Sequence, residues 1–164
     1  MLRRSLLTSA IAASLLTTFS LPTFATQVYE TDLVIIGGGL SGLAAAQSAV
    51  DQGAKPIVLE KEAALGGGGN FPEGSLGVGT RYQKEHNINT TVDQVLTAAL
   101  QYHHYRADPH VLRVLIEESG KTIDWVMDKG AQMRGIRTMY PKDESLMTWH
   151  LFKGGAAGII QRFA

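Results

Sequence analysis

The chain has 164 residues, enough for one ordinary domain but not for two large ones. Fifteen basic and fifteen acidic residues give a net charge of zero, and no run of Lys and Arg forms a basic patch, so nucleic-acid binding is not expected. The sequence contains no cysteine, which excludes disulfides, Cys-ligated zinc and cysteine nucleophiles, while its 45% hydrophobic content fits a packed core.

Residues 1–25 have the pattern of a signal peptide. Arg3 and Arg4 precede an uncharged apolar stretch, residues 5–19, that is too short to span a membrane comfortably. Small residues before and at Ala25 predict cleavage after it, and the arginine pair leaves both the Sec and the twin-arginine route open. We therefore expect an exported protein, periplasmic or secreted, whose mature part is 26–164 and keeps no membrane span.

The first part of the mature chain predicts a βαβ unit over residues 32–60. "DLVII" at 32–36 is a short apolar run of the kind that forms a buried parallel strand. Residues 40–52 are rich in alanine with helical spacing, and Gly53 is typical of a helix end. "IVLE" at 57–60 predicts the second strand, so the expected fold class is α/β and Rossmann-like.

The turn between the first predicted strand and helix carries the motif G-x-G-x-x-G. In "GGGLSG", Gly37 permits a tight turn, Gly39 lets the backbone approach a pyrophosphate, and Gly42 lets the helix pack closely against the sheet. The N–H groups that open the helix receive phosphate charge, and the Ser41 hydroxyl adds a donor. Glu60, at the end of the second strand, is placed to accept hydrogen bonds from ribose hydroxyls.

The segment "ALGGGGNFPEGSLG", residues 64–77, follows the second strand directly. In an NAD domain this strand is normally followed by another helix and strand, whereas here a glycine-rich stretch without clear periodicity runs over 61–88. The stretch is either a flexible linker or a second contact with a large cofactor. A linker joins two domains, whereas this loop leaves the ribose-binding strand of a single domain, which favours a cofactor contact and FAD over NAD.

Helical patterns resume after this loop. Thr91 is a predicted N-cap for a helix to about residue 105, and Asp108 followed by Pro109 predicts the start of another. That helix is expected to stop at Gly120, with a further short helix over 122–129. Residues 131–153 give no clear pattern, and the glycines at 154–158 open an apolar run that predicts a last helix.

At this point the chain resembles the fumarate reductase and succinate dehydrogenase flavoprotein superfamily, strongly over 32–70 and more weakly over 71–164. The resemblance implies that the first glycines bind the FAD pyrophosphate, that Glu60 binds the adenosine ribose with Lys61 beside the cofactor, and that the next glycine stretch follows the pyrophosphate and ribityl region. Gly74 and Gly77 would then lie near the isoalloxazine. The expected cofactor-binding residues are Gly37, Gly39, Leu40, Ser41, Gly42, Glu60, Lys61, Gly68, Gly69 and Asn70.

The histidines receive no catalytic or metal role from the sequence. No histidine lies between Gly66 and Gly79, so the resemblance implies non-covalent FAD. His150 precedes a Gly-Gly pair that the resemblance places near the flavin, yet a buried structural histidine is the favoured interpretation. The remaining histidines make no convincing metal site, and no catalytic residue is assigned.

The resemblance implies an FAD-dependent oxidoreductase that transfers hydride between flavin and a small carboxylate substrate, with room for a redox partner protein. Relatives of this type are far longer, so residues 26–164 are expected to be the N-terminal part of an incomplete FAD-binding domain, inactive by itself. Two alternatives remain open, a non-catalytic nucleotide-binding fragment and an NAD-binding dehydrogenase domain.

Overall fold

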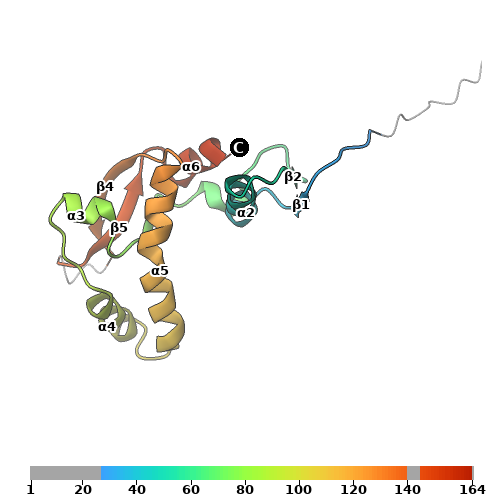
Figure 1. Cartoon of the computed structure of the whole chain (residues 1–164). Helices are drawn as coiled ribbons and strands as arrows, with labels where there is room; N and C mark the ends of the chain where they lie inside the picture. Colours follow the sequence, from blue (N-terminus) through green and yellow to red (C-terminus); the bar gives the residue numbers. More distant parts are fainter. Residues whose placement is uncertain (1–26, 140–144, 164) are drawn as a thin grey trace, which may run out of the picture. The chain divides into compact units, whose positions relative to one another are not determined.

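The structure is a computed structural model that describes residues 27–139 and 145–163. The chain divides into two units, Met1–Glu30 and Thr31–Ala164, and every helix and strand of the described residues belongs to the second unit (Figure 1). The predicted signal peptide lies outside the described residues. Within the described ranges, no helix is long and apolar enough to cross a membrane.

The predicted βαβ unit is confirmed. Strand β1 (Leu33–Ile36) leads into helix α2 (Leu40–Asp51), which returns to strand β2 (Pro56–Leu59). The two strands are parallel, and Leu33 lies opposite Pro56 at the start of the register. Helix α2 buries the side chains of Leu43, Ala46 and Ala49.

The glycine-rich stretch after β2 contains regular structure that its composition did not predict. It forms a 3₁₀ turn η1 (Gly67–Asn70), a short strand β3 (Gly74–Leu76) and a short helix α3 (Arg81–Glu85). Strand β3 belongs to a sheet whose other strands come from residues far along the chain. Because the pairing partner is so distant, no local pattern indicated the strand.

Two capped helices follow, and one prediction about them was wrong. Helix α4 (Val92–Tyr102) begins at Thr91 in a capping box, and helix α5 (Pro109–Asp128) begins at Asp108, both as predicted. However, α5 does not stop at Gly120. The helix continues for two further turns. Gly120 lies where α5 meets the backbone of Val78, so its lack of a side chain serves packing, because a Cβ there would overlap the Val78 carbonyl oxygen.

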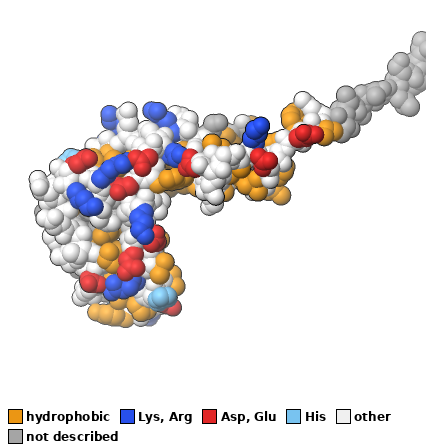
Figure 2. All heavy atoms as spheres, viewed as in Figure 1, with side chains coloured by type: hydrophobic (Ala, Val, Ile, Leu, Met, Phe, Trp, Pro, Cys, Tyr) orange, Lys and Arg blue, Asp and Glu red, His pale blue; other side chains and the backbone are white. Residues whose placement is uncertain are grey.

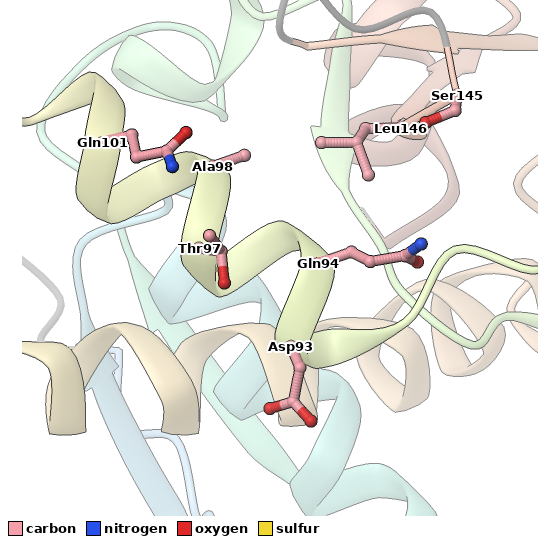
Figure 3. A pocket seen from close by; sticks show the side chains of 7 residues that line it. All are labelled: Asp93, Gln94, Thr97, Ala98, Gln101, Ser145 and Leu146. Atoms are coloured by element: carbon pink, nitrogen blue, oxygen red, sulfur yellow. The ribbon is translucent and has the colours of Figure 1, made fainter.

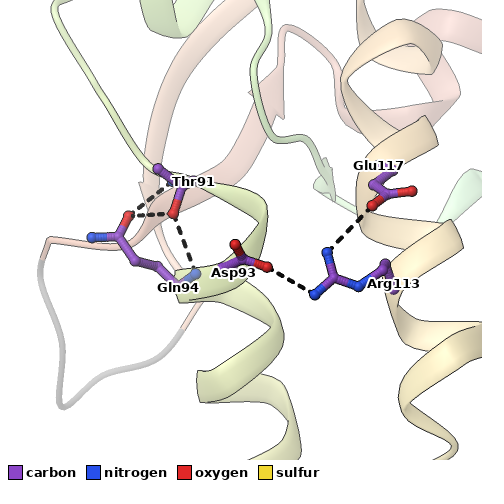
Figure 4. Close-up of polar contacts among 5 residues, drawn as sticks. All are labelled: Thr91, Asp93, Gln94, Arg113 and Glu117. Carbon is purple, nitrogen blue, oxygen red and sulfur yellow. Dashed lines mark hydrogen bonds and ion pairs between the residues drawn. The ribbon is translucent and has the colours of Figure 1, made fainter.

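A small ion-pair network connects α4 and α5 (Figure 4). Arg113 on α5 donates to Asp93 on α4 at 2.8 Å and to Glu117, one turn along α5, at 3.4 Å. The pairs are solvent-exposed, so their contribution to stability is small. Acidic and basic side chains are interspersed over the visible face, in keeping with the zero net charge (Figure 2).

A three-stranded antiparallel sheet occupies the region that the sequence left unassigned. Strand β5 (Met147–Phe152) lies between β3 and β4 (Met133–Thr138), and helix α6 (Gly155–Phe163) follows it as predicted. Two buried apolar clusters hold this part together. Their buried members are Val78, Val95, Leu96 and Ile116 in one, and Ile123, Val126, Phe152 and Ile159 in the other.

Candidate functional site

The turn between β1 and α2 has the shape that the glycine motif predicts. Gly37 has φ of 100°, a conformation that suits glycine. Gly42 leaves no room for a side chain, because a Cβ there would overlap the Gly37 carbonyl oxygen and lie 3.4 Å from Ile35 of β1. The first glycine thus makes the turn, and the third lets α2 approach the strand closely.

The amino end of α2 is open. Gly39 is the N-cap residue and carries no side chain that caps the helix, and no acidic residue lies in the first turn. The first N–H groups of an α-helix have no acceptor within the helix, and the helix dipole adds partial positive charge there. Leu40 and Ser41, the first two helical residues, are exposed. This end of α2 is therefore suited to an anion such as a pyrophosphate.

Glu60 closes the same turn from the end of β2. Its Oε2 atom accepts from the Gly38 N–H at 2.6 Å, and its Oε1 atom accepts from the N–H groups of Lys61 at 2.8 Å and Glu62 at 2.9 Å. The N–H of Glu62, followed by that of Gly38, holds the pKa of the Glu60 carboxyl below its ordinary value. An ionised carboxylate accepts about four hydrogen bonds, so Glu60 keeps capacity for a hydroxyl ligand.

The glycine-rich loop is attached to this turn. Gly66 donates its N–H to the Gly38 carbonyl at 2.7 Å, and Gly39 and Gly66 form an isolated parallel bridge. Asn70 stabilises η1 from within, because its side-chain amide donates to the carbonyls of Leu65 at 3.0 Å and Gly67 at 3.3 Å. The structure thus brings together three segments that the sequence singled out separately: the first glycine turn, Glu60 and the glycine-rich loop.

Side-chain packing fixes η1 against two helices. A Cβ on Gly69 would lie 2.5 Å from Cγ of Leu40, so glycine at 69 lets α2 support the turn. On another side, Ile160 of α6 lies within 2.6 Å of the Cβ position of Gly66. The N–H of Ala156 in α6 donates to the Pro72 carbonyl just after the turn at 2.8 Å. Sequence reasoning missed this role of α6, although its glycine-rich start was a visible signal.

Gly39 and Gly68 differ from the other glycines of the two loops. No protein atom lies within 4 Å of a Cβ on Gly68, and on Gly39 the nearest is the Gly66 carbonyl oxygen at 3.9 Å. Neither residue has the positive φ that favours glycine. The protein itself therefore gives no steric or conformational reason for glycine at these positions. Glycine at such open positions also permits the close approach of a ligand to the backbone.

Lys61 and His150 differ in their exposure to solvent. Lys61 is exposed and pairs with Glu62 at 3.3 Å. His150 is fully buried in the sheet on β5, where both ring nitrogens are hydrogen-bonded, in line with the favoured interpretation as a structural histidine. Among the described residues, no group of His, Cys, Asp or Glu is arranged to hold a metal ion.

One hollow in the described part of the chain has a lining that includes no residue of the glycine loops (Figure 3). It has a volume of about 410 Å³ and is lined by one face of α4, from Asp93 to Gln101, together with Ser145 and Leu146. Figure 3 shows polar side chains of α4 along this opening. None of the predicted cofactor-binding residues contributes to it, so the candidate site is the surface formed by the two glycine loops and Glu60.

A parallel βαβ unit with an open helix start, a glycine turn and a carboxylate at the end of the second strand defines a dinucleotide-binding α/β domain. The family model described as "FAD binding domain" matches residues 32–157. The chain belongs to this family, whose cofactor is FAD.

The most similar curated proteins include reductases. The chain is 35% identical over 129 residues to vinyl phenol reductase of Lactiplantibacillus plantarum, a match that covers 79% of this chain and 26% of that protein. It is 31% identical over 143 residues to NADH:fumarate oxidoreductase of Klebsiella pneumoniae, covering 80% of this chain and 15% of that protein. The chain thus spans about a quarter or less of the length of these relatives.

The fold is shared with a solved structure of the open conformation of a flavocytochrome c3 fumarate reductase. The TM-score is 0.66 at 21% sequence identity, and the match covers 96% of this chain and 26% of the other. A 3-ketosteroid-Δ4-(5α)-dehydrogenase from Rhodococcus jostii matches with a TM-score of 0.67 at 22% identity, covering 88% and 37% of the two chains. These likenesses concern the fold.

Proposed function

We propose that the surface formed by the two glycine loops and Glu60 binds the pyrophosphate and adenosine ribose of FAD in a flavin-dependent oxidoreductase. The observation that carries the proposal is a pair of glycines that have no structural need to be glycine: Gly39, the N-cap residue of α2, and Gly68 in η1. The family membership and the reductase relatives support the same assignment.

Each predicted residue has a specific task in this proposal. The N–H groups at the start of α2, with the Ser41 hydroxyl, receive the pyrophosphate charge. Glu60 accepts hydrogen bonds from ribose hydroxyls while its backbone partners keep it ionised. Lys61 lies beside the cofactor, while Leu40 and Asn70 hold η1 in place, so that Gly68 and Gly69 present backbone to the cofactor. FAD, when bound, supplies the hydride chemistry.

The substrate proposal comes from the relatives. The curated matches include proteins named NADH:fumarate oxidoreductase and acrylate reductase flavoprotein subunit, whose named substrates are unsaturated carboxylates. We propose that the protein to which this domain belongs reduces a small carboxylate of this class, with electrons from a redox partner protein. A reduced-dye assay with fumarate and acrylate checks this proposal, and the absence of turnover in a flavin-loaded protein would refute it.

Flavin binding is tested directly on the chain. Titration with FAD, followed by flavin fluorescence and visible absorbance, should show saturable binding, whereas NAD should not compete at equal concentration. Because no histidine lies between Gly66 and Gly79, acid precipitation of the protein should release all of the flavin. If FAD at high excess leaves the spectrum and fluorescence unchanged, the proposal is wrong for this chain. Protection by NAD alone would favour the NAD-binding alternative.

We also propose that the chain is exported after cleavage at Ala25. Arg3, Arg4 and the apolar stretch 5–19 support this proposal. Cell fractionation with N-terminal sequencing should find a periplasmic or secreted form that starts at Thr26. Replacing Arg3 and Arg4 by lysines should block export only if the twin-arginine route is used. A full-length protein that stays in the cytoplasm would contradict the proposal.

A further inference from the structure

The segment from Gly74 to Thr80 is held by buried polar groups of two other elements, β5 and α5. Gly77 donates its N–H to the Thr148 carbonyl of β5 at 2.9 Å, and Val78 donates its N–H to the Ser119 hydroxyl of α5 at 3.1 Å. Thr80 is fully buried. Buried polar groups of this kind are expensive to leave unpaired, so each contact fixes the backbone of the segment.

His150 is the residue that connects these groups. Its Nδ1 atom lies 3.0 Å from the Thr148 carbonyl oxygen, and its Nε2 atom lies 2.9 Å from the Thr80 hydroxyl. A carbonyl oxygen only accepts, so Nδ1 carries the proton. In the neutral ring Nε2 is then an acceptor, and the Thr80 hydroxyl donates to it. The same hydroxyl accepts from the N–H of Gln83 at 3.0 Å.

The imidazole also lies directly against the backbone of the segment. A Cβ on Gly77 would lie 2.8 Å from both Cε1 and Nδ1 of His150, and equally close to Ile123. Gly74 has the same constraint, because a Cβ there would overlap the His150 carbonyl oxygen. The Cβ positions of both glycines therefore face β5. Because glycine has no side chain, the segment can lie this close to the strand.

Protonation of His150 would reverse this hydrogen bond. A charged imidazole donates from both nitrogens, so the Thr80 hydroxyl would accept from Nε2 and turn its own proton toward Oε1 of Gln83, which at 3.4 Å is a long and weak partner. Burial lowers the pKa of His150, while the Thr148 carbonyl and the Asp124 carboxylate on α5 act in the opposite direction. From α3, the Tyr82 ring meets the imidazole edge-on, and on the neighbouring strands Ser75 and Ile136 lie opposite His150.

We propose that His150 is a positioning residue, which as a neutral imidazole holds the Gly74–Thr80 segment in the conformation that receives the flavin end of FAD. The inference rests on the proposed function, because the resemblance to the flavoprotein superfamily places Gly74 and Gly77 near the isoalloxazine. His150 acts through Thr80 and through its contact with Gly77, without touching the cofactor itself.

The first test concerns the segment itself and needs no cofactor. Amide hydrogen exchange is measured at Gly77, Val78 and Thr80 and compared with Ala99, which lies buried inside α4. The amide oxygen of His150→Gln can take the place of Nε2 as an acceptor, whereas the shorter amide of His150→Asn reaches only the Nδ1 position. Exchange at the three segment amides should rise about tenfold in His150→Asn relative to His150→Gln, with Ala99 unchanged. His103→Gln, at an exposed histidine, is the control.

A uniform rise at all amides in both variants would overturn the inference, because it would show general destabilisation. If His150→Asn does not fold, the wild-type chain still decides the question. As the pH is lowered from 7 through the imidazole titration seen by NMR, exchange corrected for intrinsic rates should rise at the segment amides in step with that titration. If the protection of the segment amides from exchange stays constant while His150 becomes charged, the neutral imidazole does not hold the segment and the inference is wrong.

The second test concerns the flavin. His150→Asn should weaken FAD binding about tenfold and shift the visible spectrum of the bound flavin, while His150→Gln should restore both toward the wild type. If the wild-type chain binds no FAD, the proposed function fails, but the exchange experiment still decides whether His150 holds the segment. If FAD binds normally to all variants with an unchanged spectrum, the positioning role is wrong and the proposed function stands.

Discussion

Gly38 donates its backbone N–H to Oε2 of Glu60 at 2.6 Å, so the first glycine turn and the end of β2 meet at one carboxylate. The contact gives Glu60 two tasks. It fixes the turn from which α2 starts, and it leaves the carboxylate ionised at the edge of that turn, where a ribose is proposed to bind. Shape and charge of the candidate site thus depend on the same side chain.

Glu60→Gln should weaken FAD binding by about tenfold or more, because an amide oxygen is a poorer acceptor for N–H and hydroxyl donors than a carboxylate. The dissociation constant from flavin fluorescence is the measurement. Glu62→Gln is a matched control, since the Glu62 side chain is exposed and pairs with Lys61. Equal affinity of the Glu60 variant and the control would exclude Glu60 from the ribose site.

Gly39→Ala and Gly68→Ala should separate binding from folding. Each position has room for a methyl group, so the free energy of unfolding should change by no more than about 1 kcal/mol. A methyl group would nevertheless keep the cofactor from the backbone, and FAD affinity should fall about tenfold or more. Urea denaturation and FAD titration of the same samples check both parts. Normal FAD binding by both variants would remove the main support for the proposed site.

Local signals made the first glycine turn and the helix starts predictable. The G-x-G-x-x-G motif, Thr91 and Asp108 each act through neighbours within a few residues, so their roles are visible in the sequence itself. The antiparallel sheet was not predictable in the same way. Strand β3 exists because Gly74 pairs with Leu151, which lies far along the chain and shares no local pattern with it.

Gly120 shows why a correct local rule gave a wrong helix end. Glycine commonly ends helices, and this residue stands between two apolar segments of helical spacing. In the structure its lack of a side chain serves a tertiary contact with Val78, and the hydrogen bonds of α5 continue past it. The sequence alone does not distinguish a glycine that ends a helix from one that allows close packing.

Gly69→Ala tests how η1 is supported by α2. A Cβ at 69 would lie 2.5 Å from Cγ of Leu40, so the substitution should destabilise the protein by about 1–3 kcal/mol. Leu40→Ala removes the obstructing atoms. The double variant should therefore lose less free energy of unfolding than the two single variants lose together. Urea denaturation should give a coupling energy of about 0.5 kcal/mol or more. Strict additivity would show that the two residues do not support each other.

Gly120→Ala has two opposing effects on stability, one from helix propensity and one from packing. In an exposed helix interior, alanine is more stable than glycine by about 1 kcal/mol. Here the added methyl group would overlap the Val78 carbonyl, and overpacking of this kind costs about 1–3 kcal/mol, so a net loss of stability is expected. Gly135→Ala is the control, because no atom lies within 4 Å of its Cβ position. A more stable Gly120→Ala protein would mean that α5 and Val78 are not in close contact.

His150 should make the stability of the protein depend on pH below neutrality. Burial lowers the pKa of His150 in the folded state from its ordinary value of 6.5, so the unfolded chain binds the proton more readily than the folded chain. The stabilising contribution is therefore complete above about pH 6.5 and is lost progressively as the pH falls toward the lowered pKa. As the pH falls from 7.5 to 5.5, the melting temperature of the wild type should decrease, and that of His150→Gln, which cannot titrate at this position, should decrease much less.

His103→Gln is the control, because His103 is exposed, and the melting temperature of this variant should decrease as much as that of the wild type. If His150→Gln and the wild type lose stability in parallel over this range, the imidazole is not neutral and buried in the folded protein.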